Sequence, residues 1–561
     1  MKKIFISLFL VALATNVTLA KQRTLAEMKS EAVKVITSSD TNAPLKAKAL
    51  QGVKVLHSET QLSLVGFENG AFAVIANDDA FQPVLGYTTG RAGAEHAPGF
   101  VWWLETMNKS LEDQMAEGKA QAKVQRASDV KTAVAPLIKT KWGQGAPYNN
   151  MCPEYTVEGT TRRYVTGCVA TSMAQVMNYH GYPTKGTGST SYRYTPQGGA
   201  TLTLRANFGT TSYDWANMAD DYSNGGYTAA QAEAVATLMS HCGIAVHMNY
   251  NASGSGAMSH VACRALKKYF NYSAKIGCLY REFFHVDEWM NIIYKELSDG
   301  CPIIYGGNSG TGGHSFVFDG YDEDGLVSVN WGWEGVDDGY FDIASLNGYN
   351  DIQDMVIVRL PDDDRMTQDY TYLWASQRQF YVTQSGNTLT VNDAALVCME
   401  TTAFLSLEGD EEFRGNVAFV ATDLSTGNLT VLAAVVDNND AFQYGQGVII
   451  NNLKADISSL PVGEYRLYFA SRSVEEAAAG ENWNPLRSKE GVSNSYILTV
   501  TSSGASLRQE ESSAWTGIEN VEAAEAKADG RVYSIDGRYV GNSIESLGKG
   551  LYIVNGRKVM K

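Results

Sequence analysis

One helix start constrains the fold of this chain more than any other feature of its sequence. Residues 166–171 pass from an extended segment through a glycine and a cysteine into apolar residues at helical spacing, namely Val169, Met173, Val176 and Met177. The apolar stripe ends near residues 180–183, where a glycine and a proline stop a helix. The pattern predicts an amphipathic helix with Cys168 in its first turn.

Cys168 is a candidate nucleophile because of this position. The unsatisfied N–H groups and the positive dipole at a helix N-terminus favour a thiolate over a thiol, and the thiolate is the reactive form. The structural alternative is that Cys168 is a small buried hydrophobic residue, as most free cysteines are. Position alone leaves both interpretations open.

The first twenty residues have the composition of a secretory signal peptide. They contain two lysines, an apolar run from Ile4 to Ala14, and small residues before a cleavage site after Ala20. The run is too short to span a bilayer, and no later stretch is long and apolar enough to do so. We therefore expect a secreted or cell-surface protein without a transmembrane segment. Its 7 cysteines are an odd set, so at least one thiol stays unpaired.

Composition excludes some classes of partner. The net charge of −16 and the pI near 5.1 argue against nucleic acid, because phosphate binding needs a basic surface. The cysteines form no CxxC pair and no cluster with histidines, so we expect no metal site and no cofactor. The length of 561 residues predicts about three to four domains.

Residues 21–126 predict a small folded unit followed by a cleavable linker. Two short strands flank a turn at residues 68–70, and a helix begins at Phe100. The helical pattern dissolves into residues 116–131, which are polar and contain several Lys and Arg residues. A small unit between a signal peptide and a cleavable linker is typical of a propeptide, and an ordinary N-terminal domain is the alternative.

Residues 127–360 contain a histidine in a distinctive setting. Residues 312–321 place a glycine pair before His314, which begins an alternating apolar strand. A second strand follows, ends at Asn330 and runs into Trp331. A lone histidine is more often structural than catalytic. Here the glycines allow backbone or substrate to approach closely, and strand pairing brings Asn330 and Trp331 toward His314.

These residue types suit attack of sulfur on a peptide bond. The reaction needs a thiolate, a histidine that stabilises it and later protonates the leaving amine, and donors aimed at the developing oxyanion. Gln144, in the stretch 142–149, is a candidate side-chain donor. Its partner would be the backbone N–H of Cys168, which a helix N-terminus leaves free.

Four motifs, in order, resemble the streptopain family of papain-like secreted cysteine proteases. They are the stretches 142–153, 166–183, 312–321 and 329–343. The resemblance implies an α+β fold, with a papain-like catalytic domain over residues 127–360 and an α+β inhibitory propeptide over residues 21–126. A propeptide of this family holds the protease inactive as a zymogen and is removed by proteolysis.

The resemblance also implies roles for individual residues. Cys168 would be the nucleophile, His314 its general acid/base, and Gln144 a donor in the oxyanion hole. Gly313 and the loop 253–256, through Ser255, would line the substrate cleft.

Two further residues concern the orientation of the histidine. The resemblance implies that Trp331 packs beside the histidine. Papain-like enzymes usually orient the histidine with an asparagine, whereas a tryptophan occupies that region in the streptopain group. Asn330 is therefore either a histidine-orienting residue or a structural one.

The C-terminal third of the chain predicts a separate β structure. Residues 365–505 alternate apolar and polar residues in short runs between turns, which is typical of an immunoglobulin-like β-sandwich. Residues 506–561 begin as a linker and end in two hairpin signals at 534–538 and 554–557. This short tail resembles the C-terminal sorting domain of proteins exported by type IX secretion. A small structural cap is the alternative.

The favoured function is that of a secreted cysteine endopeptidase made as a zymogen. Its partners would be protein or peptide substrates, its own propeptide as an intramolecular inhibitor, and the type IX secretion machinery. We expect maturation by cleavage near residues 126–131. A cell-wall amidase or amide-transfer enzyme on the same fold is one alternative, because those classes share Cys/His sites. A non-enzymatic surface adhesin is the other, and the intact Cys168 and His314 disfavour it.

Overall fold

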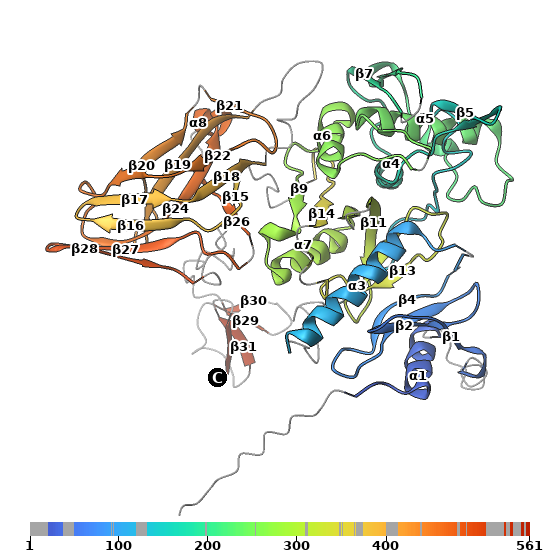
Figure 1. Ribbon diagram of the computed structural model, residues 1–561, viewed down its shortest axis with the longest axis horizontal. Coiled ribbons are helices and arrows are strands. Elements are labelled where there is room, and N and C mark those ends of the chain that lie inside the picture. Colours follow the sequence, from blue (N-terminus) through green and yellow to red (C-terminus); the bar gives the residue numbers. More distant parts are fainter. Residues whose placement is uncertain are drawn as a thin grey trace, which may run out of the picture. The chain divides into compact units, whose positions relative to one another are not determined.

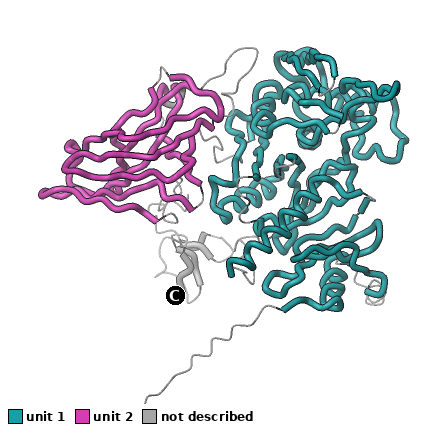
Figure 2. Tube along the Cα trace, viewed as in Figure 1, with its two compact units in different colours: residues 1–371 teal, residues 372–561 magenta. Residues whose placement is uncertain are grey.

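A computed structural model describes most of residues 21–511 and four short strands beyond them. The longest gaps are 38–49, 119–131, 366–373 and 400–412, and the predicted signal peptide and maturation site lie outside the described residues. The chain divides into two compact units, residues 1–371 and residues 372–561 (Figure 2).

The first unit is built around one antiparallel sheet (Figure 1). Within its described residues the α-helices are α1 (Leu25–Ile36), α3 (Pro98–Ala116), α4 (Cys168–His180), α5 (Ala229–Ala245), α6 (Ser259–Phe270) and α7 (Val286–Ser298). The sheet has, in spatial order, β1 (Lys54–Ser58), β2 (Leu62–Gly66), β3 (Phe72–Ala76), β4 (Val84–Thr88), β13 (Gly339–Phe341), β12 (Val327–Asn330), β11 (Gly313–Tyr321), β10 (Ile303–Asn308), β14 (Gln353–Val356) and β9 (Cys278–Tyr280). Two further hairpins pair β5 (Glu154–Val157) with β6 (Thr160–Arg163) and β7 (Ser189–Tyr194) with β8 (Leu202–Asn207).

The segment predicted as a propeptide is continuous with this sheet. Strands β1 to β4 form an antiparallel meander, and β4 pairs with β13 of the following segment through Gly86 with Phe341 and Tyr87 with Tyr340. Helix α1 begins with a capping box at Thr24 and packs against β2 and β3. The predicted hairpin around residues 68–70 and the helix near Phe100 are confirmed.

Helix α3 brings aromatic side chains from the N-terminal segment onto the sheet. Phe100 contacts Trp331 and Phe341, and Trp102 contacts Phe316. Gly307 permits this approach, because a Cβ there would collide with the Trp102 ring. Full burial of a side chain as large as phenylalanine stabilises a fold by about 1.5–3 kcal/mol. The helix is therefore held firmly against β10 and β11.

Helix α4 matches the predicted helix, from Cys168 to His180. Its N-cap is Gly167 at φ +87°, and its C-cap is Gly181 in the left-handed conformation. Glycine adopts both conformations without strain. A side chain at position 167 would also approach Met248 to 2.7 Å and the Ser255 carbonyl oxygen to 2.9 Å. The apolar stripe is buried against β11, so the cysteine at its start is fixed by the core.

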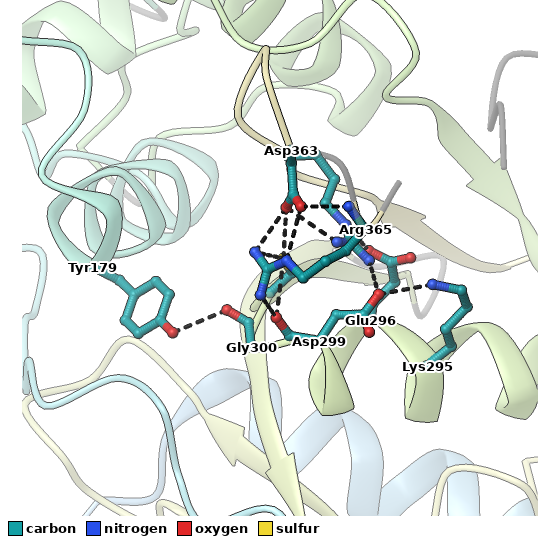
Figure 3. A network of polar contacts seen from close by, with 9 residues as sticks. Tyr179, Lys295, Glu296, Asp299, Gly300, Asp363 and Arg365 are labelled. Atoms are coloured by element: carbon teal, nitrogen blue, oxygen red, sulfur yellow. Dashed lines mark hydrogen bonds and ion pairs between the residues drawn. The ribbon is translucent and has the colours of Figure 1, made fainter. Parts of the chain in front are cut away.

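A network of ion pairs around a buried arginine lies at the C-terminal end of the described part of this unit (Figure 3). The guanidinium of Arg359 is fully buried and donates to Glu296 at 2.6 Å, to Asp363 at 3.1 Å and to Asp299. Arg365 adds a second guanidinium, which pairs with Asp363 at 2.8 Å. The network ties the end of α7 to Arg359, Asp363 and Arg365, and Arg365 is the last described residue of this unit.

The second unit is rich in β structure. Its described strands are β15 (Trp374–Ser376), β16 (Tyr381–Ser385), β17 (Thr388–Asn392), β18 (Ala394–Cys398), β19 (Phe413–Asp423), β20 (Leu429–Val436), β21 (Ala441–Phe442), β22 (Gly447–Ile450), β23 (Leu453–Asp456), β24 (Gly463–Ser473), β25 (Asn484–Pro485), β26 (Arg487–Ser488), β27 (Tyr496–Thr501) and β28 (Gly504–Gln509), with helix α8 (Val474–Ala479). Strands β19, β20, β24, β27 and β28 belong to one sheet, and their inward side chains share a core with those of β16 to β18. The immunoglobulin-like topology stays a prediction.

The predicted hairpins of the tail coincide with strands. These are β29 (Val532–Ser534), β30 (Tyr539–Gly541), β31 (Leu551–Val554) and β32 (Arg557–Met560). Strand β29 pairs with β30, and β31 pairs with β32. The tail therefore has the two hairpins that its turn residues predict.

Candidate active site

Cys168 differs from the other cysteines in its exposure. All 7 cysteines belong to the described residues and none forms a disulfide. Six are buried, and only Cys168 is partly exposed. A thiol that reacts with substrate must be reached by it, so exposure favours Cys168 over the others.

The sulfur of Cys168 lies among backbone amides. Burial by the surrounding segments raises the pKa of the thiol, while hydrogen bonds from the N–H groups of Ser315, Val169 and Cys168 itself oppose the rise. The last two belong to the first turn of α4, as the helix-start argument requires. The Ser315 amide shows that β11 reaches the start of α4 one residue after His314.

His314 is the second residue of β11 and pairs with Gly307 of β10. Because strand residues alternate between faces, His314 shares a face with Phe316, which packs against Trp102 of α3. Burial lowers the pKa of its imidazole. In the described part of the chain, no hydrogen bond joins this imidazole to the Cys168 sulfur. Burial thus favours a neutral thiol and a neutral imidazole rather than an ion pair.

Two loops converge on the residues just before Cys168. The backbone carbonyl of Gln144 accepts the N–H of Thr166 at 3.2 Å. The Ser255 hydroxyl donates to the Val165 carbonyl at 2.8 Å. Gly313 is exposed at the start of β11. Residue 253 of the predicted loop lies outside the described residues.

Trp331 is buried beneath α3. Its ring contacts Phe316 and Phe100 with centroids 4.7 and 6.1 Å apart, and its indole N–H donates to the Asp337 carbonyl at 3.0 Å. Trp331 follows β12, the strand next to β11. Its ring therefore packs against Phe316, which lies on the same face of β11 as His314.

The hydrogen bonds of Asn330 lead away from the histidine. Its Oδ1 accepts from Gln175 Nε2 at 3.0 Å and from the Gly332 N–H at 3.0 Å. Its Nδ2 donates to the Thr140 carbonyl at 2.8 Å. These contacts favour the structural alternative for Asn330.

Sequence reasoning missed several residues around the site. Trp102 and His96 come from the N-terminal segment, and no local signal links either of them to β10, β11 or Asp337. His96 Nδ1 lies 3.0 Å from the carboxylate of Asp337, which is fully buried. Gln175 carried no clear signal, since it lies seven positions after Cys168 on the polar side of the helix, beside Thr171 and Ser172.

Among the described residues, no group of three or more His, Cys, Asp and Glu side chains is placed to hold a metal ion. The helices of the described ranges include none that is long and apolar enough to cross a membrane.

Comparisons with known proteins match the region of the site. Residues 142–341 match the Peptidase C10 family. Streptopain of Streptococcus pyogenes is 33% identical over 332 residues, which are 57% of this chain and 82% of streptopain. The thiol protease/hemagglutinin PrtT of Porphyromonas gingivalis is 31% identical over 316 residues, 52% of this chain, but the match spans only 36% of that relative.

A solved structure agrees with these relatives. It is a fragment of prointerpain A of Prevotella intermedia, in a variant with a cysteine replaced by alanine. It is 40% identical to this chain, has a TM-score of 0.50, and is matched over 97% of its own length and 54% of this chain. The resemblance of the four motifs to the streptopain family is confirmed. Because the chain is 33% identical to streptopain over 82% of that relative and matches the family over residues 142–341, it belongs to the Peptidase C10 family, the streptopain family of cysteine proteases.

Proposed function

We propose that Cys168 cleaves peptide bonds with His314 as its acid and base. The Cys168 sulfur attacks the substrate carbonyl, and the N–H of Cys168 and the side chain of Gln144 stabilise the oxyanion. Protonated His314 gives its proton to the departing amine, which leaves a thioester. His314 then takes a proton from water as the hydroxide adds to the thioester, and cleavage of the C–S bond releases the acid product and leaves the Cys168 thiolate beside protonated His314.

The convergence of three segments on one helix start carries this proposal. The loops of Gln144 and Ser255 contact residues 165 and 166, and β11 contacts Cys168 through the Ser315 amide. A buried structural cysteine needs no such arrangement of donors and glycines. Matured protein should hydrolyse casein under reducing conditions, and a thiol-directed epoxide inhibitor should block it. Release of peptides from cell-wall material, with casein left intact, would instead favour the amidase alternative.

The N-terminal segment would keep this site inactive. Helix α3 packs against β10 and β11, the strand pair that carries His314. Burial favours neutral Cys168 and His314, whereas catalysis needs the thiolate and the imidazolium. Cleavage near residues 126–131 and loss of α3 would uncover the His314 face of the sheet. The ion pair can then form.

Replacement of Trp102 by alanine should speed maturation. A buried tryptophan replaced by alanine costs about 3–5 kcal/mol, and here the cost falls on the contact between α3 and the sheet. We expect maturation at least about tenfold faster, measured by gel during incubation under reducing conditions. Glu105→Ala, an exposed position on the same helix, should leave the rate unchanged. Unchanged or slower maturation of Trp102→Ala would contradict the proposed inhibition.

His96 should make proenzyme stability depend on pH. Its hydrogen bond to Asp337 raises the pKa of His96 above its ordinary value near 6.5, against the opposing effect of burial. The stabilisation is therefore complete below about pH 6.5 and is lost as pH rises through the raised pKa. Its size is about 1 kcal/mol or less, because the side chain is 37% exposed and solvent screens the pair.

Urea unfolding of the Cys168→Ala proenzyme, with and without His96→Gln, measures this contribution. The difference in unfolding free energy between the two proteins should shrink as pH rises from about 6 to 8. The neighbouring carboxyl of Asp338, whose pKa burial raises to about 8, is present in both proteins and largely cancels. A difference that stays constant or grows with pH would exclude the role of His96.

The signal peptide and the tail support export as the fate of the protein. Cleavage after Ala20 would deliver a secreted or cell-surface proenzyme, and the two tail hairpins would serve as the type IX sorting signal. Removal of residues 532–561 should then leave the protein inside the cell envelope of a bacterium with that pathway. Unchanged export without the tail would favour the structural cap.

A further inference from the structure

The side chain of Gln175 joins three segments of the candidate site. Gln175 is fully buried in α4, two turns after Cys168. Its Oε1 accepts the Thr140 hydroxyl at 2.8 Å and the Trp142 N–H at 3.3 Å. Its Nε2 donates to Asn330 at 3.0 Å. One amide thus connects the nucleophile helix to the segment that leads to Gln144 and to the end of β12.

Asn330 completes the connection. It accepts from Gln175 and from the Gly332 N–H, and it donates to the carbonyl of Thr140 at 2.8 Å. Thr140 is therefore held twice, through its hydroxyl by Gln175 and through its carbonyl by Asn330. The turn that follows Asn330 carries Trp331, so the same bonds fix the strand end beside the His314 strand.

The donors and acceptors around Gln175 and Asn330 fit one orientation of the two side-chain amides. Gln175 Oε1 faces two donors, and Asn330 Oδ1 faces two donors as well. A flip of either amide would set N–H groups against N–H groups and leave buried polar atoms unsatisfied. A buried network of matched donors and acceptors specifies one geometry more strictly than apolar packing does.

We propose that Gln175 is a positioning residue that sets the oxyanion segment against the nucleophile helix. This inference rests on the proposed function, because it assigns Gln175 a role in the reaction of Cys168. Gln144 is two residues beyond Trp142, so a shift at Trp142 moves the candidate donor relative to the Cys168 N–H. Donors of this kind act on the transition state, and their displacement lowers kcat more than it raises KM.

Two variants of Gln175 separate positioning from stability. Gln175→Leu removes all three hydrogen bonds of the side chain, and we expect a loss of kcat of about tenfold to a hundredfold with KM changed less than about threefold. Met177→Ala is the matched control, since Met177 is fully buried in the same helix and makes none of these bonds. It should lower the unfolding free energy by about 2–5 kcal/mol and keep kcat within about twofold of wild type.

The pH dependence of kcat in Gln175→Glu separates a positioning role from a purely structural one. The carboxylate keeps the acceptor for Thr140 and Trp142 but sets an oxygen against Asn330 Oδ1. When protonated, it donates an O–H in place of the lost N–H, and burial raises the pKa of such a carboxyl. The kcat of Gln175→Glu relative to wild type should therefore recover as pH falls, whereas Gln175→Leu should show no such recovery.

The outcomes distinguish this inference from the proposed function. Wild-type kcat in Gln175→Leu, or an equal loss of kcat in Met177→Ala, would overturn the positioning role while Cys168 remained the nucleophile. Absence of acid recovery in Gln175→Glu would also overturn it. Activity that survives in Cys168→Ala, measured in parallel, would instead remove the proposed function itself.

Discussion

Replacement of Cys168 by alanine is expected to abolish both peptide hydrolysis and self-maturation. In the proposed mechanism the Cys168 thiolate forms the covalent intermediate, and no other cysteine can take its place because the other six are buried. We expect casein hydrolysis to fall by more than about a thousandfold, as when other proteases lose their nucleophile. The variant should accumulate at full length, which a gel of purified protein shows directly.

A second cysteine provides the control for this experiment. Cys398 is buried in the β-rich unit, and Cys398→Ala should keep maturation and casein hydrolysis within about twofold of wild type. Hydrolysis of casein by Cys168→Ala at a rate near that of wild type would show that the nucleophile lies elsewhere. A full-length Cys168→Ala protein that is cut by added mature enzyme would show that maturation can occur between molecules.

Replacement of Arg359 by methionine is expected to be the most destabilising single change away from the candidate site. The guanidinium is fully buried, and so is the Glu296 carboxylate that it contacts at 2.6 Å. Removal of the arginine leaves that carboxylate buried without its cation, which costs about 3–5 kcal/mol. Urea unfolding in the Cys168→Ala background, which prevents self-digestion, measures the loss in the first unit.

Lys295 belongs to the same network and gives the matched control (Figure 3). It pairs with Asp299 at 2.7 Å, but its side chain is 38% exposed. Lys295→Ala should therefore cost less than about 1 kcal/mol, as exposed ion pairs do. Equal losses in the two variants would contradict the view that burial gives Arg359 its importance.

The local features of the site were predictable from the sequence because each depends on a short stretch. Apolar residues at helical spacing placed the start of α4 at Cys168, and alternation after a glycine pair placed His314 at the start of β11. The hairpin of β2 and β3 followed from its turn residues. Such patterns report which face of an element is buried, and this is decided within a few residues.

The contacts between distant segments were not predictable in the same way. The pairing of β4 with β13 joins Gly86 to Phe341, and no pattern in either strand names its partner. Trp102 can pack against β10 only because residue 307, far along the chain, is a glycine without a side chain. Asn330 illustrates the same limit, since strand pairing and the family resemblance left both an orienting and a structural role open, while its hydrogen bonds go to Gln175, Gly332 and Thr140. Long-range pairing is set by the whole core rather than by local preference.

The rate at which an uncharged alkylating reagent labels Cys168 tests the central claim most directly. Mass spectrometry of freshly purified protein separates full-length from matured molecules and identifies the labelled cysteine in each. In the full-length form we expect slow labelling that rises only at alkaline pH, because burial raises the pKa of this thiol. In the matured form we expect fast labelling of Cys168 near neutral pH, with loss of casein hydrolysis in proportion to the label. Equal labelling rates in the two forms, or loss of activity with the label on another cysteine, would contradict a Cys168 nucleophile that the N-terminal segment holds inactive.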